Sequence, residues 1–243
     1  MEKLIHLPID PEYIFRKKRA LKRKLLERSG LTPKRIAILG GSTTSEIVEL
    51  LELFLLDAGI KPTFYQSQYN RYYEDIMFGD SELEALDPDI IYIHTTYANA
   101  LYLPNYKDTY EVVSNLKDRE KNRYLDLWNR IKEKYNCPII QNNFELPSDE
   151  SLGHLGFSDF RAATNYINHI NIFFAEAART INSLYIHDIH SLSSRYGLNR
   201  WHSKHHWYAY KYAMDINAIP EFSYSLSAVI KAILGRNKKC LVL

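Results

Sequence analysis

The sequence predicts a three-layer α/β/α fold built on a five-stranded parallel sheet. Short apolar segments of strand length alternate with longer segments of helical periodicity along the chain, which is the pattern of repeated βαβ units. The strand segments are apolar on both faces, as expected where helices cover a sheet on both sides. The chain of 243 residues is 46% hydrophobic, which is enough for one large domain with a sizeable core.

The first predicted element is a basic helix at 12–29. Its apolar residues, among them Leu21 and Leu25, recur at helical spacing between Lys and Arg residues. Gly30 and Pro33 are expected to end it. Two interpretations of its charge stay open: a surface that docks an acidic carrier protein, or a solvated face on a helix that packs by its leucines.

A strand at 35–39 and a helix at 43–58 follow. The strand is apolar after its first residue, which indicates a buried position. Thr43 and Glu46 have the spacing of a capping box. The helix is apolar on most of its sides, so we expect it to be buried, and Gly59 terminates it.

The same alternation continues along the rest of the chain. The further predicted strands are residues 62–66, 89–94, 137–141 and 184–188, and the further helices are residues 110–135, 158–181 and 217–234. Right-handed crossovers bring the carboxyl ends of parallel strands to one edge, where ligands bind in open α/β sheets. The loops expected at this edge are residues 40–44, 66–73, 94–99, 141–147 and 188–206.

Composition restricts the class of protein. A net charge of only +2 is not that of a polyelectrolyte binder, so we expect no nucleic-acid partner. No apolar run is long enough to span a bilayer, and Met1–Pro8 lacks the apolar core of a signal peptide. A cytoplasmic location is therefore expected. Cys137 and Cys240 lie far apart and are expected to be buried thiols rather than metal ligands.

The turn Gly40-Gly41-Ser42 is the leading candidate for a reactive centre. Two glycines allow a tight turn and a close approach of a ligand to the backbone. The Ser42 hydroxyl would lie at the N-terminal end of the next helix, where free N–H groups and the helix dipole favour negative charge. Ser42 is then a nucleophile beside an oxyanion site, an anion-binding residue or a helix cap, and the local sequence leaves all three open.

A serine nucleophile needs a general base, and residues 201–207 supply candidates. Three histidines, His202, His205 and His206, lie there between two tryptophans. One of them is the expected base for Ser42. The alternatives are a surface cluster stacked on aromatic rings and a zinc site, which lacks a nearby Cys or carboxylate ligand.

Amide and hydroxyl side chains follow the second and third predicted strands. These are Asn70, Thr95, Thr96 and Asn99. Together with Gly41 and Thr43, they are expected to bind the substrate or its oxyanion, and ordinary loop hydrogen bonding is the alternative. Asp188 also lies at the end of a strand, after the last one. It is as suited to capping the helix that follows as to a role in the site.

Together these segments resemble the SGNH hydrolases. That family places its serine after the first strand and an Asp-x-x-His motif before the last helix. Ser42 and His206 stand at the serine and histidine positions, whereas Ser203 stands where the family has Asp, so the imidazole lacks its usual orienting carboxylate. The family's glycine and Gly-x-Asn-Asp motifs are altered here to Gln68-Tyr69-Asn70 and Thr95-Thr96-Tyr97-Ala98-Asn99.

Nearly the whole chain also resembles the N-terminal domain of FkbH-like proteins. The resemblance rests on Ile38–Thr44, Tyr69-Asn70, Gln141–Phe144, Gly197–Trp201 and Trp207-Tyr208. It implies three parts: a basic helical extension at 1–33, an SGNH-hydrolase-like domain at 34–236, and at 237–243 the first strand of a HAD-type phosphatase domain.

The FkbH resemblance further implies a function. Better-known members of this family resemble enzymes that move a glyceryl unit from a phosphate ester onto an acyl carrier protein. This domain is then expected to bind or transfer a small acyl or phosphorylated substrate, with Ser42 at the site centre and the carrier protein as partner. The alternative is a non-catalytic module that docks the carrier or holds an anion. No cofactor is expected in this domain, since the magnesium site belongs to the HAD domain.

Overall fold

The computed structural model describes residues 4–149 and 152–236. They contain a five-stranded, all-parallel sheet in the order β2-β1-β3-β4-β5. The strands are β1 Thr32–Gly40, β2 Ile60–Gln66, β3 Ile90–His94, β4 Ile139–Asn142 and β5 Leu184–His187. The predicted fold class is confirmed, and the strand order is that of flavodoxin-like doubly wound sheets.

The predicted helices form close to their predicted limits. They are α1 Pro11–Leu26, α2 Ser45–Asp57, α5 Tyr110–Tyr135, α6 Ala163–Thr180 and α10 Ile219–Ile233. Short helices also lie in the connections: α3 Glu74–Met77, α4 Ser81–Leu86, α7 Ile189–Tyr196, α8 Leu198–Trp201 and α9 Lys204–Tyr210, with 3₁₀ turns η1 Tyr97–Asn99, η2 Gly153–Phe157 and η3 Ile216–Ala218. Of these, the sequence predicts only the helix that follows Asp188, which is α7.

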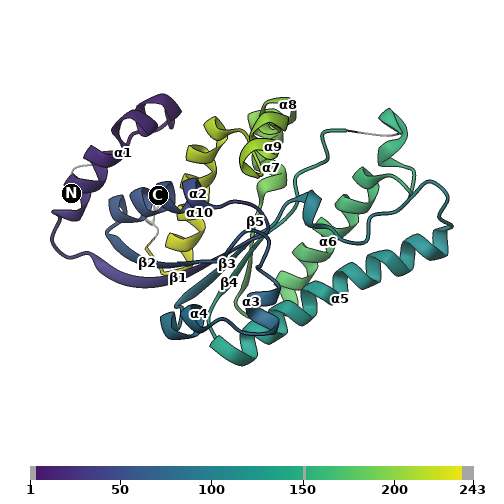
Figure 1. Cartoon of the computed structure of the whole chain (residues 1–243), viewed down its shortest axis with the longest axis horizontal. Helices are drawn as coiled ribbons and strands as arrows, with labels where there is room; N and C mark the ends of the chain where they lie inside the picture. Colours follow the sequence, from purple (N-terminus) through teal and green to yellow (C-terminus); the bar gives the residue numbers. More distant parts are fainter. Residues whose placement is uncertain (1–3, 150–151, 237–243) are drawn as a thin grey trace, which may run out of the picture.

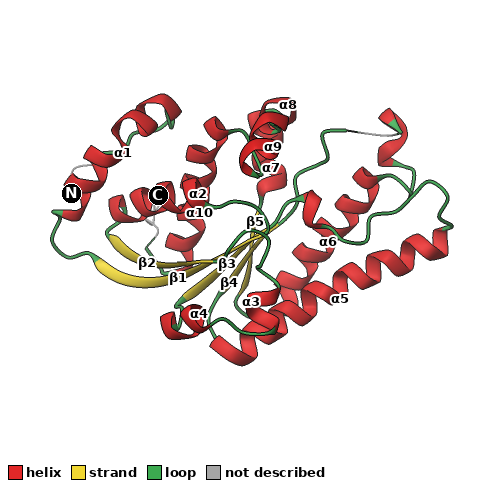
Figure 2. Ribbon diagram, in the orientation of Figure 1, coloured by secondary structure: helices red, strands yellow, loops and turns green. Residues whose placement is uncertain are grey.

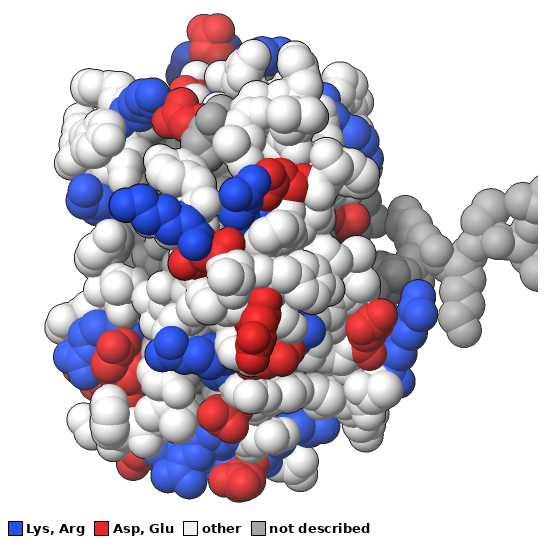
Figure 3. Space-filling model, turned by 90° about the vertical axis from the view of Figure 1, so that its right-hand side faces the viewer, with Lys and Arg blue, Asp and Glu red and all other residues white. Residues whose placement is uncertain are grey.

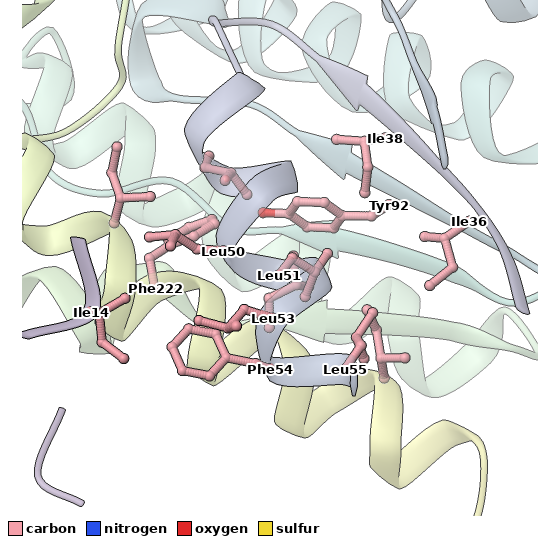
Figure 4. Packing of buried hydrophobic residues seen from close by; sticks show 14 of the residues in the cluster. Ile14, Ile36, Ile38, Leu50, Leu51, Leu53, Phe54, Leu55, Tyr92 and Phe222 are labelled. Atoms are coloured by element: carbon pink, nitrogen blue, oxygen red, sulfur yellow. The ribbon is translucent and has the colours of Figure 1, made fainter. Parts of the chain in front are cut away.

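Helices cover both faces of the sheet (Figures 1 and 2). Helices α2 and α10 pack on one face, and α5 and α6 pack on the other. Figure 4 shows the first of these layers, where Leu50 and Leu51 of α2 approach Ile38 of β1 and Phe222 of α10. All four side chains are fully buried, and each contributes about 1.5–3 kcal/mol of hydrophobic stabilisation.

Helix α1 packs against α2 by both apolar and charged contacts. Leu21 is buried in the same core cluster as α2. On either side of it, Lys18 Nζ lies 2.6 Å from Glu49 Oε2, and Lys22 Nζ lies 2.5 Å from Glu52 Oε2. Part of the positive charge that the sequence shows in this helix is therefore neutralised within the molecule.

The described surface carries both signs of charge. Figure 3 shows Lys and Arg side chains interspersed with Asp and Glu on the face that lies to the right in Figure 1. Among the described residues, no helix is both long and apolar enough to cross a membrane. Cys137 is a buried free thiol, and burial raises its pKa to about 11. The predicted strand at 237–243, which includes Cys240, lies outside the described residues.

Candidate functional site

The Ser42 turn joins the central strand β1 to helix α2 at the carboxyl edge of the sheet. The N-cap of α2 is Thr44, and its side chain makes no capping hydrogen bond. The predicted capping box of Thr43 and Glu46 is therefore wrong. In a capping box the Glu46 side chain would bind the Thr43 N–H, but this N–H donates instead to the carbonyl of Lys211 at 3.0 Å. The Thr44 hydroxyl accepts from Gln66 at 3.0 Å.

The Ser42 hydroxyl is buried and unpaired. The residue is 2% exposed, and its Oγ has no hydrogen-bond partner within the described ranges. A buried hydroxyl without a partner costs free energy, so such groups are rare in folded proteins. A capping role for Ser42 is not supported.

Asn70 and Asn99 are brought to this turn, as the sequence predicts for loops at one sheet edge. Asn99 Nδ2 donates to the Gly41 carbonyl at 3.0 Å and to Asn70 Oδ1 at 3.1 Å. Asn99 Oδ1 accepts from the Thr96 N–H at 2.9 Å. The Asn70 N–H donates to the Gly40 carbonyl at 3.0 Å, with φ 60° at Asn70. These bonds fix the backbone on one side of Ser42.

The same bonds occupy groups expected to stabilise an oxyanion. Both hydrogens of the Asn99 amide are used within the protein. The Gly41 N–H donates to the His94 carbonyl at 2.7 Å, and the Thr43 N–H to Lys211. Thr95 faces away from this network, since its N–H donates to Asn142 Oδ1 at 2.8 Å. Binding of an oxyanion at these donors therefore requires displacement of a protein acceptor.

His206 is not hydrogen-bonded to Ser42. Its Nδ1 lies 3.4 Å from Asp215 Oδ2 and 3.4 Å from the Ile216 nitrogen. Asp215 thus supplies a carboxylate next to the imidazole, whereas Ser203, at the family's Asp position, caps α9 by accepting from the His206 N–H at 3.3 Å. Nothing in the sequence pattern points to Asp215, because its approach depends on the fold of the loop after α9.

The other histidines of this segment point in different directions. His202 Nε2 bonds the Leu146 carbonyl at 2.8 Å, and burial lowers its pKa. His205 contacts the ring of Tyr210. Over the described part of the chain, no three His, Cys, Asp or Glu side chains converge as a set of metal ligands. Asp188 caps α7 by accepting from the Ser191 N–H at 3.0 Å, which is one of the two roles open for it.

Glu145, which the sequence analysis did not identify, is the most perturbed acid near this edge. It follows β4, is 1% exposed, and neither carboxylate oxygen has a hydrogen-bond partner among the described residues. Burial raises its pKa to about 8, opposed in part by nearby backbone N–H groups. It borders a cavity of about 130 Å³ together with Thr96, His202 and Tyr212.

A larger cavity of about 520 Å³ opens on the other side of Ala98 and Trp207, which border both spaces. Its walls include Asn70, Asn99 and several tyrosines. Arg123 in this wall pairs with the buried Glu120 at 3.2 Å, and Arg119 stacks over Tyr102 at 4.1 Å. The Ser42 turn, whose backbone is held by Asn70 and Asn99, therefore lies next to an open cavity with aromatic walls.

Two further histidines at the strand ends belong to the core. His94 and His187 are fully buried, and burial lowers their pKa values to about 3 and about 4. His94 Nδ1 lies 3.1 Å from the Tyr92 hydroxyl, and His187 Nε2 lies 2.9 Å from Ser225 Oγ. Both imidazoles are neutral at pH 7 and pack around Phe222.

Solved structures resemble this chain at low identity. The N-terminal part of a Bacteroides fragilis protein, which contains a phosphatase domain and was solved with Mg, superposes with a TM-score of 0.77 and 19% identity over 92% of this chain. This chain spans 58% of that one. Two weaker structural matches are to shorter chains, which this chain covers almost completely.

The first of these is the catalytic domain of the peptidoglycan O-acetyltransferase of Streptococcus pneumoniae, at 12% identity and a TM-score of 0.45, covering 85% of this chain and 94% of that one. The second is an acetyl xylan esterase, at 11% identity and a TM-score of 0.48, covering 81% and 99%. The search of curated proteins gave no significant match.

The family comparison is more specific. The family model described as FkbH, N-terminal domain, matches residues 35–231. This range begins within β1 and ends within α10, so it includes the carboxyl end of β1, the other four strands and every loop at the carboxyl edge. The chain therefore belongs to the FkbH N-terminal domain family.

Proposed function

We propose that this domain binds an acyl group at Ser42 and transfers it. The observation that carries the proposal is the buried, unpaired Ser42 Oγ on a turn whose backbone is fixed by Asn99. An unsatisfied hydroxyl at the carboxyl edge of a parallel sheet is suited to attack on a carbonyl carbon.

The proposed substrate is a small acyl group of the glyceryl type, carried as a thioester by an acyl carrier protein in the cytoplasm. In the transfer step, Ser42 Oγ forms a bond to the carbonyl carbon, the bond to the thioester sulfur breaks, and the hydroxyl proton reaches the sulfur through His206. Phosphate chemistry with magnesium is proposed for a separate phosphatase domain of the whole protein, and no cofactor is proposed here.

This chemistry requires a movement of the segment 203–212. His206 makes no hydrogen bond to Ser42 Oγ, and the Lys211 carbonyl holds the Thr43 N–H. In this arrangement the Thr43 N–H is not available to an oxyanion. When the segment shifts, the Thr43 N–H becomes available to an oxyanion and the imidazole can approach the hydroxyl.

A non-catalytic module that docks the carrier or holds an anion is the second candidate. The observation in its favour is that the donors around Ser42 are occupied by protein acceptors, so the serine is not poised for attack. The exposed side of α1, which includes Lys17, is the proposed docking surface in this case.

A fluorophosphonate probe tests the first candidate. We expect covalent labelling of Ser42, identified by peptide mass spectrometry, and none in Ser42→Ala. Incubation with an acyl-loaded carrier protein should give an acyl adduct on the same peptide. A folded protein that neither labels nor takes up the acyl group in the presence of the carrier contradicts catalysis and leaves the docking module.

A further inference from the structure

A buried carboxyl group without a protein partner points to a ligand. Glu145 is 1% exposed, both of its oxygens lack hydrogen-bond partners in the described part of the chain, and it borders a cavity of about 130 Å³. Unpaired carboxyls of this kind are costly to bury, and buried polar groups are nearly always satisfied by protein, water or ligand. The proposed Ser42 chemistry does not use this residue.

The cavity is linked to the Ser42 turn through the hydrogen bonds of two neighbouring segments. Thr96, in its wall, donates its N–H to Asn99, and Asn99 in turn holds the Gly41 carbonyl. Tyr212, also in its wall, follows Lys211, whose carbonyl binds the Thr43 N–H. Gly41 and Thr43, the residues immediately before and after Ser42, are thus linked to this cavity indirectly, through Asn99 and Lys211.

The position of Glu145 is fixed by its neighbour in sequence. The Leu146 carbonyl bonds His202 Nε2 at 2.8 Å, which ties the loop after β4 to the segment before α9. At the mouth of the cavity Lys204 and Asp149 form an exposed ion pair at 3.4 Å. Both carboxylate oxygens of Glu145 are shielded from solvent, whereas this ion pair is exposed.

We propose that Glu145 is a ligand-binding residue whose carboxyl group hydrogen-bonds an uncharged, hydroxyl- or carbonyl-bearing group of the substrate in this cavity. The proposal rests on the proposed function, because it takes the bound group to be the one that is transferred at Ser42. It specifies that the transferred group is uncharged. An anionic head such as a phosphate or carboxylate is disfavoured beside Glu145, since it would meet a buried acid whose oxygens have no cationic partner among the described residues.

The surroundings of Glu145 agree with a neutral ligand. Hydroxyl-bearing residues Thr96, Ser148, Ser203, Tyr208 and Tyr212 contribute to the same wall. Because burial raises the pKa of Glu145 to about 8, the group is protonated at pH 7 and can donate to a carbonyl or hydroxyl oxygen. The other titratable or charged residues that line this cavity are Tyr97, Asp149, His202, Lys204, Tyr208 and Tyr212.

Binding of matched small probes tests this assignment. Glycolamide and glycolate share a hydroxyl and a carbonyl group and differ in charge, and glycinamide replaces the hydroxyl by an ammonium group. We expect saturation-transfer NMR and titration at pH 6.5 to show binding of glycolamide at least about fivefold tighter than of glycolate or glycinamide. The affinity for glycolamide should fall as the pH rises through 8.

Two variants assign the effect to Glu145. Glu145→Gln keeps a donor and an acceptor, so it should bind glycolamide within about twofold of the unmodified protein and lose the pH dependence. Glu145→Leu should weaken glycolamide binding at least about fivefold. Its thermal unfolding should remain cooperative, which shows that the variant is folded. Preferential binding of glycolate or glycinamide, an unchanged affinity in Glu145→Leu, or a retained pH dependence in Glu145→Gln overturns the proposal.

Labelling of Ser42 by the fluorophosphonate probe and binding of glycolamide are separate measurements, and together they distinguish this proposal from the proposed function. Binding that depends on Glu145, in a protein whose Ser42 never labels, would keep the cavity assignment and remove catalysis. Labelling of Ser42 without glycolamide binding would do the opposite.

Discussion

Asn99 and Gly41 are in direct contact through the side-chain amide of the former and the backbone of the latter. Asn99 Nδ2 donates to the Gly41 carbonyl at 3.0 Å, and a Cβ atom built on Gly41 would lie 2.5 Å from Asn99 Oδ1. No real Cβ contact is that short, so the glycine is required by the amide that packs against it. This contact fixes the backbone immediately before Ser42.

Gly41→Ala should therefore destabilise the protein by about 1–3 kcal/mol, as overpacking of a closed site does. Asn99→Ala should cost about 1–3 kcal/mol, because it leaves buried hydrogen-bonding groups unpaired. In the double variant the clash is absent, so the combined loss should be smaller than the sum of the two. Urea unfolding of the four proteins measures this coupling, and strictly additive losses would contradict the contact.

Ser42→Ala should leave the stability unchanged or raise it by about 1 kcal/mol, because it removes a buried hydroxyl that has no partner. Ser67→Ala is the matched control. Ser67 is also buried, but its Oγ accepts from the Gly40 N–H at 2.7 Å, so its loss should cost about 1 kcal/mol. Thermal melting compares the two. Equal destabilisation in both variants would mean that the Ser42 hydroxyl has a partner after all.

The sheet and its long helices could be predicted from the sequence because their apolar patterns are local. The helix predicted at 110–135 is observed as Tyr110–Tyr135, and the strand predicted at 89–94 as Ile90–His94. The meeting of Asn70 and Asn99 at the Ser42 turn followed from the rule that parallel strands end at one edge. Each of these inferences needs only neighbouring residues or a general rule of topology.

The remaining features of the site depend on contacts between distant loops. The Thr43 capping box failed because the carbonyl of Lys211 takes the Thr43 N–H, and no pattern near Thr43 indicates this. The approach of Asp215 to His206 depends on how the chain turns after α9. Glu145 is an ordinary acid in the sequence, and only the packing of its loop buries it.

Asp215→Asn tests the role of the carboxylate beside His206. Asn keeps the acceptor oxygen that binds the Asn217 N–H at the start of η3, so the fold should be preserved. The negative charge next to the imidazole is lost. If His206 accepts a proton during acyl transfer, the rate of Ser42 labelling or acylation should fall at least about tenfold. An unchanged rate in Asp215→Asn together with a lost rate in His206→Gln would show that His206 acts without this carboxylate.

Charge reversal on α1 should separate its structural from its docking role. Lys22→Glu places a like charge beside Glu52 and should destabilise the protein by about 1 kcal/mol. Lys17→Glu changes an exposed residue and should leave the melting temperature unchanged. If α1 docks an acidic carrier protein, Lys17→Glu should weaken carrier binding, and the loss should shrink as salt rises. Carrier binding that is unaffected in Lys17→Glu removes α1 as the docking surface.

Glu145 should make the protein less stable as the pH rises from about 5 to about 8. Its pKa is raised from 4.5 in the unfolded chain to about 8 in the folded protein, so in this range the folded state holds a proton that the unfolded state has released. Unfolding is then favoured by higher pH, by at most about 1.4 kcal/mol for each pH unit. The buried histidines act in the opposite direction, because the lowered pKa values of His94 and His187 let the unfolded state bind protons below about pH 6.5.

Comparison with Glu145→Gln cancels the contribution of the histidines, which both proteins share. Urea unfolding at pH 5, 6, 7 and 8 should show a stability difference, variant minus unmodified protein, that grows by about 1 kcal/mol or more per pH unit over this range. A difference that stays constant from pH 5 to pH 8 would mean that Glu145 is ionised in the folded protein. It would then need a buried cationic partner, and the uncharged ligand group assigned to its cavity would lose its physical basis.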